Sequence, residues 1–205
     1  MNEMNSLKQS NPRMRILEVA IQLFYAEGVR ATGTEKIMSQ AEVAKATFYR
    51  HFESKDALVL AYLENRDRAF WDYLLKPTPP RDLTEALIKL DQMANRADVT
   101  SCPFLRIASE YPDPAHPFHR RVIEHQNGIL DYLADLLKPL VSDSRAAAAQ
   151  ILAVVDGALS MRLVYGTSNA VPLLSTAEAI LQSLQSPAQA VAQEPSLLGT
   201  QETGI

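Results

Sequence analysis

The sequence predicts an all-α protein of about nine helices, with a small N-terminal three-helix domain followed by a larger helical domain. Apolar residues recur at intervals of three and four along most of the chain, as on one face of an α-helix. No long stretch alternates with a period of two, and no Asn-Gly or Asp-Gly turn separates two β-branched runs. Hydrophobic residues make up 47% of the 205-residue chain and charged residues 21%, which is an ordinary globular composition.

The first part of the chain contains the signals of four helices. Asn11 followed by Pro12 is typical of a helix start, and Gly28 is typical of a helix end. Two short helices are expected over residues 34–40 and 44–51. Ser54 is a suitable N-cap for a fourth helix that extends to about residue 75.

Proline-rich segments divide the rest of the chain. After the break at residues 76–80, an apolar stripe runs from Leu83 to Ala97, and a short helix is expected after Pro103. The segment 111–117 is expected to be a loop. Three further helices are then expected, over residues 118–136, 143–166 and 175–185.

These breaks predict three parts of the chain. Residues 1–55 form the first domain, preceded by a short flexible N-terminus, and residues 56–185 form the second. Residues 186–205 are rich in Ala, Gln, Pro, Ser and Gly and lack an apolar stripe, so we expect a disordered tail there.

Charge and cysteine content narrow the class of protein. The net charge is −4, but residues 1–55 carry eight Lys/Arg against six Asp/Glu, so only the first quarter is suited to a polyanion. A single cysteine, Cys102, excludes an internal disulfide and agrees with the reducing cytoplasm. The N-terminus has no apolar run of the kind found in a secretory signal.

The apolar segment 146–166 resembles a membrane span in length. It contains Asp156 and Arg162, and a charge at the centre of a bilayer costs about 2.5–3.5 kcal/mol. We therefore expect a buried or subunit-facing helix and no membrane partner.

The stretch 47–58, TFYRHFESKDAL, indicates a surface for phosphate and bases. Phe48 and Phe52 are four residues apart, so they share one helix face and can anchor it to neighbouring helices. The remaining faces carry side chains that donate hydrogen bonds, as reading of the major groove requires. Lys55 lies in the first turn of the next helix, where the helix dipole disfavours a cation unless a phosphate docks there.

With these motifs, residues 13–66 resemble the DNA-binding domain of the tetracycline-repressor (TetR) family. The resemblance rests on Gly28, on Thr32 and Thr34, and on the runs 47–52, TFYRHF, and 54–56, SKD. It implies contacts to base edges by Lys45, Ala46, Thr47 and Arg50. It implies contacts to phosphates by Thr34, Tyr49, His51 and Lys55. Two departures, Glu42 in the turn and Ala44 at the start of the third helix, stand where the family often has Gly and Ser.

The resemblance also implies a homodimer that binds a palindromic double-stranded DNA operator as a transcriptional repressor, released by a small apolar or aromatic effector. No metal, cofactor or catalytic residue is expected. The residues expected to line the effector pocket are Trp71, Met93, Phe104, Ile107, His125 and Asp156. Those expected at the dimer interface, in the last two helices, are Leu152, Val155, Leu159, Leu163, Ile180 and Leu184.

Two alternatives remain open from the sequence. The polar cluster at 110–125, with His116, His119 and His125, is the only material for acid–base or metal chemistry in an enzyme. The chain is alternatively a DNA-binding dimer without an effector. Cys102 is either a buried thiol or a redox sensor, and Asp156 needs a partner such as Arg106, Arg162, a cationic ligand or a second subunit.

Overall fold

The computed structural model describes residues 11–185, and these form nine α-helices and no strand, so the all-α prediction is confirmed. The helices are α2 (Pro12–Glu27), α3 (Thr34–Gln40), α4 (Lys45–His51), α5 (Lys55–Leu75), α6 (Leu83–Ala94), α7 (Pro103–Glu110), α8 (Pro117–Leu137), α9 (Ser144–Tyr165) and α10 (Leu173–Gln185). The expected flexible N-terminus and disordered tail, residues 1–10 and 186–205, lie outside the described residues.

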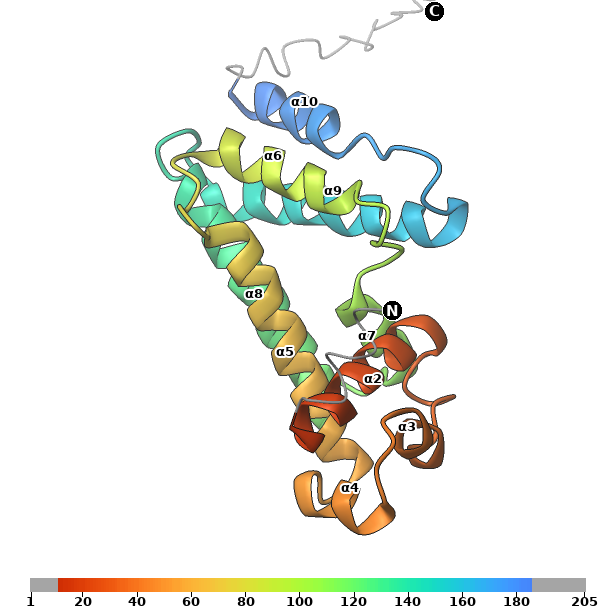
Figure 1. Ribbon diagram of the computed structural model, residues 1–205. Helices are drawn as coiled ribbons and strands as arrows, with labels where there is room; N and C mark the ends of the chain where they lie inside the picture. The colour runs from red at the N-terminus through yellow and green to blue at the C-terminus, as the bar shows by residue number, and fades with distance from the viewer. Residues whose placement is uncertain (1–10, 186–205) are drawn as a thin grey trace, which may run out of the picture.

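The helices form two groups joined by two long helices (Figure 1). Helices α2, α3 and α4 pack together at one end of the molecule, while α6, α9 and α10 lie across the other end. The long helices α5 and α8 lie side by side and connect the two ends. The short helix α7 packs on α8 and is hydrogen-bonded to α2 and the residues that follow it.

Helix starts follow the capping rules read from the sequence. The Asn11 Oδ1 accepts a hydrogen bond from the backbone of Arg13 at 2.9 Å, and the Ser54 Oγ accepts one from Ala57 at 3.0 Å. Each bond satisfies a backbone N–H that the first helical turn leaves free.

Two boundaries differ from the expectation. Helix α6 ends at Ala94, because Asn95 caps it, and Ala97 is exposed instead of continuing the stripe. Helix α8 begins at Pro117, inside the expected loop, because the His116 Nδ1 accepts a hydrogen bond from the backbone of Phe118 and caps the helix.

The core of the α2–α4 end contains the two phenylalanines of the stretch 47–58. Phe48 is 0% exposed and Phe52 is 3% exposed, and their ring centroids lie 6.3 Å apart. The predicted anchoring face of α4 is therefore confirmed.

Arg162, in α9, is the largest buried polar side chain of the described part of the chain, at 2% exposed. Its guanidinium donates to the backbone carbonyls of Arg96 and Val99 on one side and of Thr167 and Asn169 on the other. These bonds satisfy the buried donors and join the α6–α7 link to the α9–α10 link. Arg162 is therefore not the partner of Asp156.

Helix α9 is the one described helix that is long and apolar enough to cross a membrane, with 39% of its most apolar window buried in the structure. A core helix of a soluble protein passes the same test. Here α9 packs against α8 on one side and α10 on another, as expected for a helix of a protein interior or interface.

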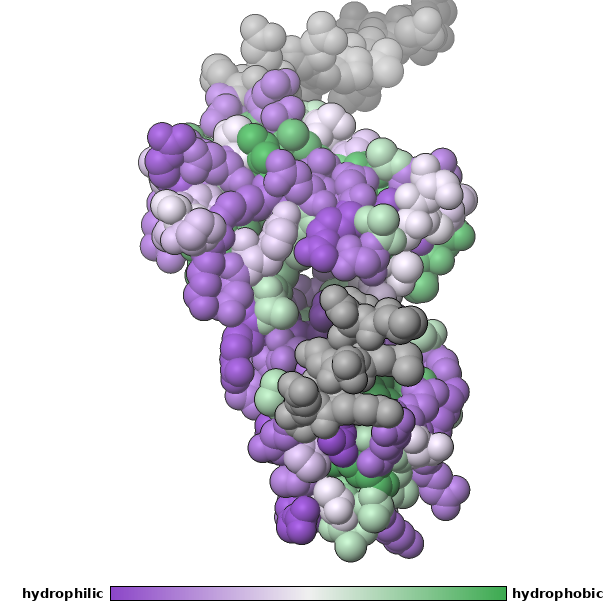
Figure 2. Space-filling view, viewed as in Figure 1, coloured by the Kyte–Doolittle hydropathy of each residue, from purple (hydrophilic) through white to green (hydrophobic). Residues whose placement is uncertain are grey.

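The surface carries both hydrophilic and hydrophobic residues (Figure 2). Hydrophilic residues cover most of the visible face, and hydrophobic residues reach the surface where α9 ends. Leu163 is 56% exposed there and Val164 is 71% exposed. This end of α9 is therefore an exposed hydrophobic patch.

Candidate nucleic-acid interface and inner cavity

The turn between α3 and α4 orients the expected recognition helix. Glu42 lies in this turn with a φ of +51°, the left-handed region that glycine adopts most easily. The Val43 N–H donates to the Met38 carbonyl at 3.1 Å, and the Arg15 Nε donates to the Ala41 carbonyl at 3.2 Å. These bonds fix the angle between α3 and α4.

The outer face of α4 carries free hydrogen-bond donors. Lys45, Ala46, Tyr49 and Arg50 are exposed, and Thr47 and His51 are half-buried. Within residues 11–185, the polar side chains of this set make no hydrogen bond or ion pair. The donors are therefore available to an external partner.

Two expected phosphate contacts flank this face. Thr34 is the first residue of α3, and Lys55 is the first residue of α5; both are half-buried. Partial burial lowers the pKa of the Lys55 ammonium, although the carboxylates of Glu110 and Asp56 act in the opposite direction. Lys55 thus lies where an added anion stabilises its charged form.

An inner cavity of about 440 Å³ lies between α2, α5, α8 and α9 and the segment that leads into α7. Of the residues expected to line an effector pocket, Met93, Phe104, His125 and Asp156 line this cavity. The other two are not among its lining residues. Trp71 packs edge-on against Phe70 and Tyr132, behind the wall, and Ile107 is buried on α7.

The polar groups of the cavity are held by residues distant in sequence. The His125 Nδ1–H donates to the Asp67 carboxylate at 2.6 Å, and the His125 ring stacks on Phe104 with centroids 3.7 Å apart. Burial lowers the pKa of His125, so its ring is held neutral. The Asp156 carboxylate accepts a hydrogen bond from the Gln126 Nε2 at 2.8 Å, and its burial raises its pKa to about 6.

Several cavity residues were not anticipated from the sequence. Tyr25, Arg66, Tyr73 and Gln126 line the wall, yet each sits in an ordinary amphipathic helix. Only the packing of α2, α5 and α8 around one space brings them together, so no local signal identifies them.

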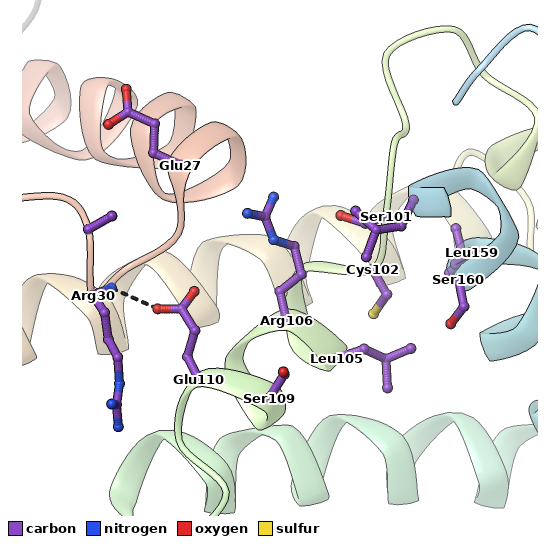
Figure 3. Close-up of a pocket in the computed structure, with 12 residues that line it drawn as sticks. Glu27, Arg30, Ser101, Cys102, Leu105, Arg106, Ser109, Glu110, Leu159 and Ser160 are labelled. Carbon is purple, nitrogen blue, oxygen red and sulfur yellow. Dashed lines mark hydrogen bonds between the residues drawn. The ribbon is translucent and has the colours of Figure 1, made fainter. Parts of the chain in front are cut away.

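A second hollow, an outer cleft of about 560 Å³, lies between the end of α2, helix α7 and the end of α9 (Figure 3). Ser101, Cys102 and Leu159 line both the outer cleft and the inner cavity. At the far end of the cleft, the Glu110 carboxylate accepts hydrogen bonds from the backbone N–H groups of Val29 at 3.1 Å and Arg30 at 2.7 Å.

Gly28 permits this approach of Glu110. Its φ of +91° is in the left-handed region, and a Cβ added there would lie 2.7 Å from the Glu110 Oε1. A side chain at position 28 would therefore strain the backbone and displace the carboxylate.

The histidines at 116, 119 and 125 do not converge. The His119 Nδ1 donates to the Tyr111 carbonyl at 2.7 Å, whereas His116 caps α8 and His125 faces the cavity. No group of three metal-ligating side chains is present in residues 11–185.

Cys102 is 8% exposed, and burial raises the pKa of its thiol to about 11. A thiol with such a pKa is almost fully protonated at neutral pH and therefore a poor nucleophile. The structure agrees with the buried-thiol interpretation of this residue.

The residues expected at a dimer interface fall into three classes of exposure. Val155 and Leu159 are buried within the subunit and line the inner cavity. Leu152 and Ile180 are half-buried, and Leu163 and Leu184 are exposed.

Comparisons with known proteins agree with the helix-turn-helix geometry of α3 and α4. The family model described as "Bacterial regulatory proteins, tetR family" matches residues 16–62. A solved TetR-family transcriptional regulator from Streptomyces coelicolor is 30% identical, over 85% of this chain and 96% of that chain, with a TM-score of 0.78. A second solved regulator, from Streptomyces avermitilis, is 29% identical over 85% of this chain and 98% of its own, with a TM-score of 0.71.

Two curated relatives are also transcriptional regulators. The transcriptional regulator YjdC of Escherichia coli K12 is 25% identical over 159 residues, 74% of this chain and 83% of YjdC. The transcriptional repressor NemR of the same organism is 24% identical over 142 residues, 66% of this chain and 71% of NemR.

A helix-turn-helix with a donor-rich outer face, joined to a larger helical body, defines the class of DNA-binding transcriptional regulators. The chain belongs to the TetR family of these regulators.

Proposed function

We propose that this regulator is a homodimeric, cytoplasmic repressor that leaves a palindromic operator when a small effector occupies the inner cavity. Residues 1–55 are the DNA-binding domain, and residues 56–185 bind the effector and form the dimer. The protein needs no cofactor and catalyses no reaction. A curated relative that is itself a repressor supports this direction of regulation.

The proposed contacts with DNA follow from the free donors of α4 and its neighbours. Lys45, Ala46, Thr47 and Arg50 face the base edges of the major groove. The phosphates are held by Thr34, Tyr49, His51 and Lys55. In a two-fold symmetric dimer the two recognition helices enter the groove about 34–36 Å apart, or a multiple of that distance.

The proposed dimer forms through an exposed face of α9 together with α10. On α9 this face consists of Ala146, Gln150, Ala153, Gly157, Met161 and Val164, all exposed. Apart from the backbone of α9 itself, a Cβ added at Gly157 would meet no atom of residues 11–185 within 4 Å. Small side chains at the centre of the face allow the helices of two subunits to approach closely.

The observation that carries the proposed regulation is the way the cavity wall is bonded to α2. The Tyr25 hydroxyl accepts hydrogen bonds from the backbone N–H groups of Thr100 at 2.7 Å and Ser101 at 3.1 Å, and Tyr25 and Ser101 both line the cavity. Arg106 of α7 also donates to the Tyr25 carbonyl. Helix α2 packs directly on α3 and α4.

A ligand that pushes on this wall therefore acts on α2 and, through it, on the recognition helix. It lowers operator affinity only if it binds one arrangement of α2 and α7 more tightly than the other.

The test is binding of the purified protein to the DNA that flanks its own gene, across a series of salt concentrations, beside a Tyr49→Phe, Lys55→Ala double variant. We expect sequence-selective binding that weakens steeply with salt. The double variant should bind more weakly, with a slope of log K against log salt that is shallower by about 1 per subunit, because Lys55 is the charged contact of the two. Lys138→Ala is the control, because Lys138 is an exposed lysine at the opposite end, paired with Asp135.

Equal slopes for the double variant and Lys138→Ala would contradict the phosphate contacts. Failure to select any sequence from random DNA would contradict the operator itself. Transcription of the flanking genes in a strain that lacks the protein decides the direction of regulation, since repression predicts a rise.

A further inference from the structure

Asp156 is a carboxylate in the cavity wall that has no basic partner within residues 11–185. Its Oδ2 accepts a hydrogen bond from the neutral Gln126 amide at 2.8 Å, and no lysine, arginine or histidine of the described chain forms an ion pair with it. The other carboxylate of the cavity, Asp98, is neutralised by the Arg96 guanidinium at 2.7 Å. Asp156 is thus the uncompensated negative charge of this cavity.

The wall around the cavity is rich in aromatic rings. The rings are those of Tyr25, Phe70, Tyr73, Phe104 and His125. Phe70 and Phe104 both pack on His125, which precedes the Asp156 partner Gln126 in α8. The faces of such rings carry partial negative charge and attract cations.

The basic residues of the cavity do not neutralise the charge of Asp156. Arg96 is engaged by Asp98, and His125 is held neutral by burial. Arg66 of α5 lies by α2, with its guanidinium 6.0 Å from the centre of the Tyr25 ring, and it forms no ion pair with Asp156.

A buried carboxylate without a counter-charge is unfavourable, and a cation placed beside it removes that penalty. We propose that the effector is an organic monocation, with a protonated or quaternary amine beside Asp156 and an apolar or aromatic body against Phe70, Phe104 and His125. This inference rests on the proposed role of the inner cavity as the effector site. A cavity of about 440 Å³ has the size of typical small-molecule sites.

Ionisation of Asp156 sets the pH dependence of cation binding. Burial raises its pKa to about 6, so the carboxylate is mostly charged at pH 7.5 and mostly protonated at pH 5. The cation therefore binds well above pH 6 and poorly below it. A quaternary ammonium ion has no proton to lose, so any pH dependence of its binding belongs to the protein.

The experiment compares two probes of equal shape, phenyltrimethylammonium and tert-butylbenzene, in which a charged nitrogen replaces a neutral carbon. Binding is followed by calorimetry and by the fluorescence of Trp71, the one tryptophan of the chain, which contacts the cavity residue Phe70. At pH 7.5 we expect the native protein to bind the cation about tenfold more tightly than its neutral isostere. At pH 5 we expect that preference to fall about tenfold as Asp156 protonates.

Two variants, each of which removes one negative charge, test whether Asp156 causes the preference for the cation. Asp156→Asn should abolish the preference for the cation and leave binding of tert-butylbenzene intact. Asp98→Asn removes the other cavity carboxylate and should retain the preference, because Arg96 and Asp98 are both exposed and solvent screens the charge that Arg96 keeps. The pH series on the native protein gives an independent test if Asp156→Asn fails to fold.

Equal affinity for the two probes, or equal loss in both variants, would overturn the assignment of a cation to Asp156. If tert-butylbenzene binds without any preference for the cation, the cavity remains the effector site and only the charge of the effector is wrong. If neither probe binds, the cavity takes no ligand of this size, and the proposed effector site fails together with this inference.

Discussion

Glu42 adopts a backbone conformation that is unfavourable for a residue with a side chain. Its φ of +51° places it in the left-handed region, in the turn that sets the angle of α4. A residue with a Cβ loses about 1–2 kcal/mol in that conformation, and glycine does not. The carboxylate also brings a negative charge to the surface proposed to face DNA.

We expect Glu42→Gly to raise the free energy of unfolding by about 0.5–1 kcal/mol, because relief of strain exceeds the added flexibility of the unfolded chain. Urea denaturation measures this change. Glu42→Ala is the matched control, since it removes the charge and keeps the Cβ. If the alanine variant gains as much stability as the glycine variant, charge and not strain is the cause. Both variants should bind DNA more tightly.

The partner of Asp156 depends on which residues surround it in the folded protein. As an interruption of an apolar helix it is compatible with an ion pair, a ligand or a second subunit. In the structure it faces a cavity and is bonded to Gln126, so an ion pair with Arg106 or Arg162 is excluded. Arg106 bonds to Tyr25 and Arg162 to backbone carbonyls.

At the scale of elements, α7 is the helix that lies between the proposed effector cavity and the end of α2. Its first turn lines the inner cavity with Pro103 and Phe104. Its last residue, Glu110, holds the backbone after α2 at Val29 and Arg30. Helix α7 therefore joins the wall of the inner cavity to the backbone that follows α2.

Removal of the Glu110 carboxylate should loosen this connection. We expect Glu110→Ala to lower the free energy of unfolding by about 1–2 kcal/mol, since two backbone donors lose a charged acceptor. It should also weaken operator binding, although Glu110 itself is not one of the proposed DNA contacts. Denaturation and DNA titration measure the two effects.

Glu27→Ala is the matched control, because Glu27 also lines the outer cleft but forms only an exposed ion pair with Lys36. Such pairs contribute about 0–1 kcal/mol. Equal effects of the two alanine substitutions would show that the bonds of Glu110 to the α2 end carry no special coupling.

At the scale of the whole molecule, the proposed function depends on the arrangement of two subunits. Each chain presents one recognition helix, and a palindromic site requires two at a fixed distance. The exposed end of α9, where Leu163 is 56% and Val164 is 71% exposed, continues the proposed interface and gives it apolar area.

A larger side chain at the centre of the α9 face should separate the subunits. We expect Gly157→Leu to be a folded monomer with strongly reduced operator affinity, since leucine has a higher helix propensity than glycine and a Cβ at this exposed position meets no neighbouring side chain of the described residues. Sedimentation and light scattering measure the mass, and circular dichroism checks the fold. Gly157→Ala is the control and should remain a dimer. A dimeric leucine variant with native operator affinity would place the interface elsewhere.

The sequence by itself determined where the nine helices of residues 11–185 lie to within a few residues, the caps at Asn11 and Ser54, and the buried face of α4. These features depend on neighbours three or four positions apart, as with Phe48 and Phe52 or Ser54 and Ala57. A pattern of that range is fully contained in the sequence. The same local pattern carried the resemblance to the TetR family.

Only the tertiary structure decided which residues form the cavity and what holds its polar groups. Gln126 and Asp156 are 30 positions apart, and Glu110 lies 81 and 80 positions from Val29 and Arg30. Trp71 and Ile107 are apolar helix residues like Phe70 and Phe104, yet they lie outside the cavity. An apolar stripe shows that a helix face is buried, but the packing of whole helices decides whether that face meets another side chain or an open space.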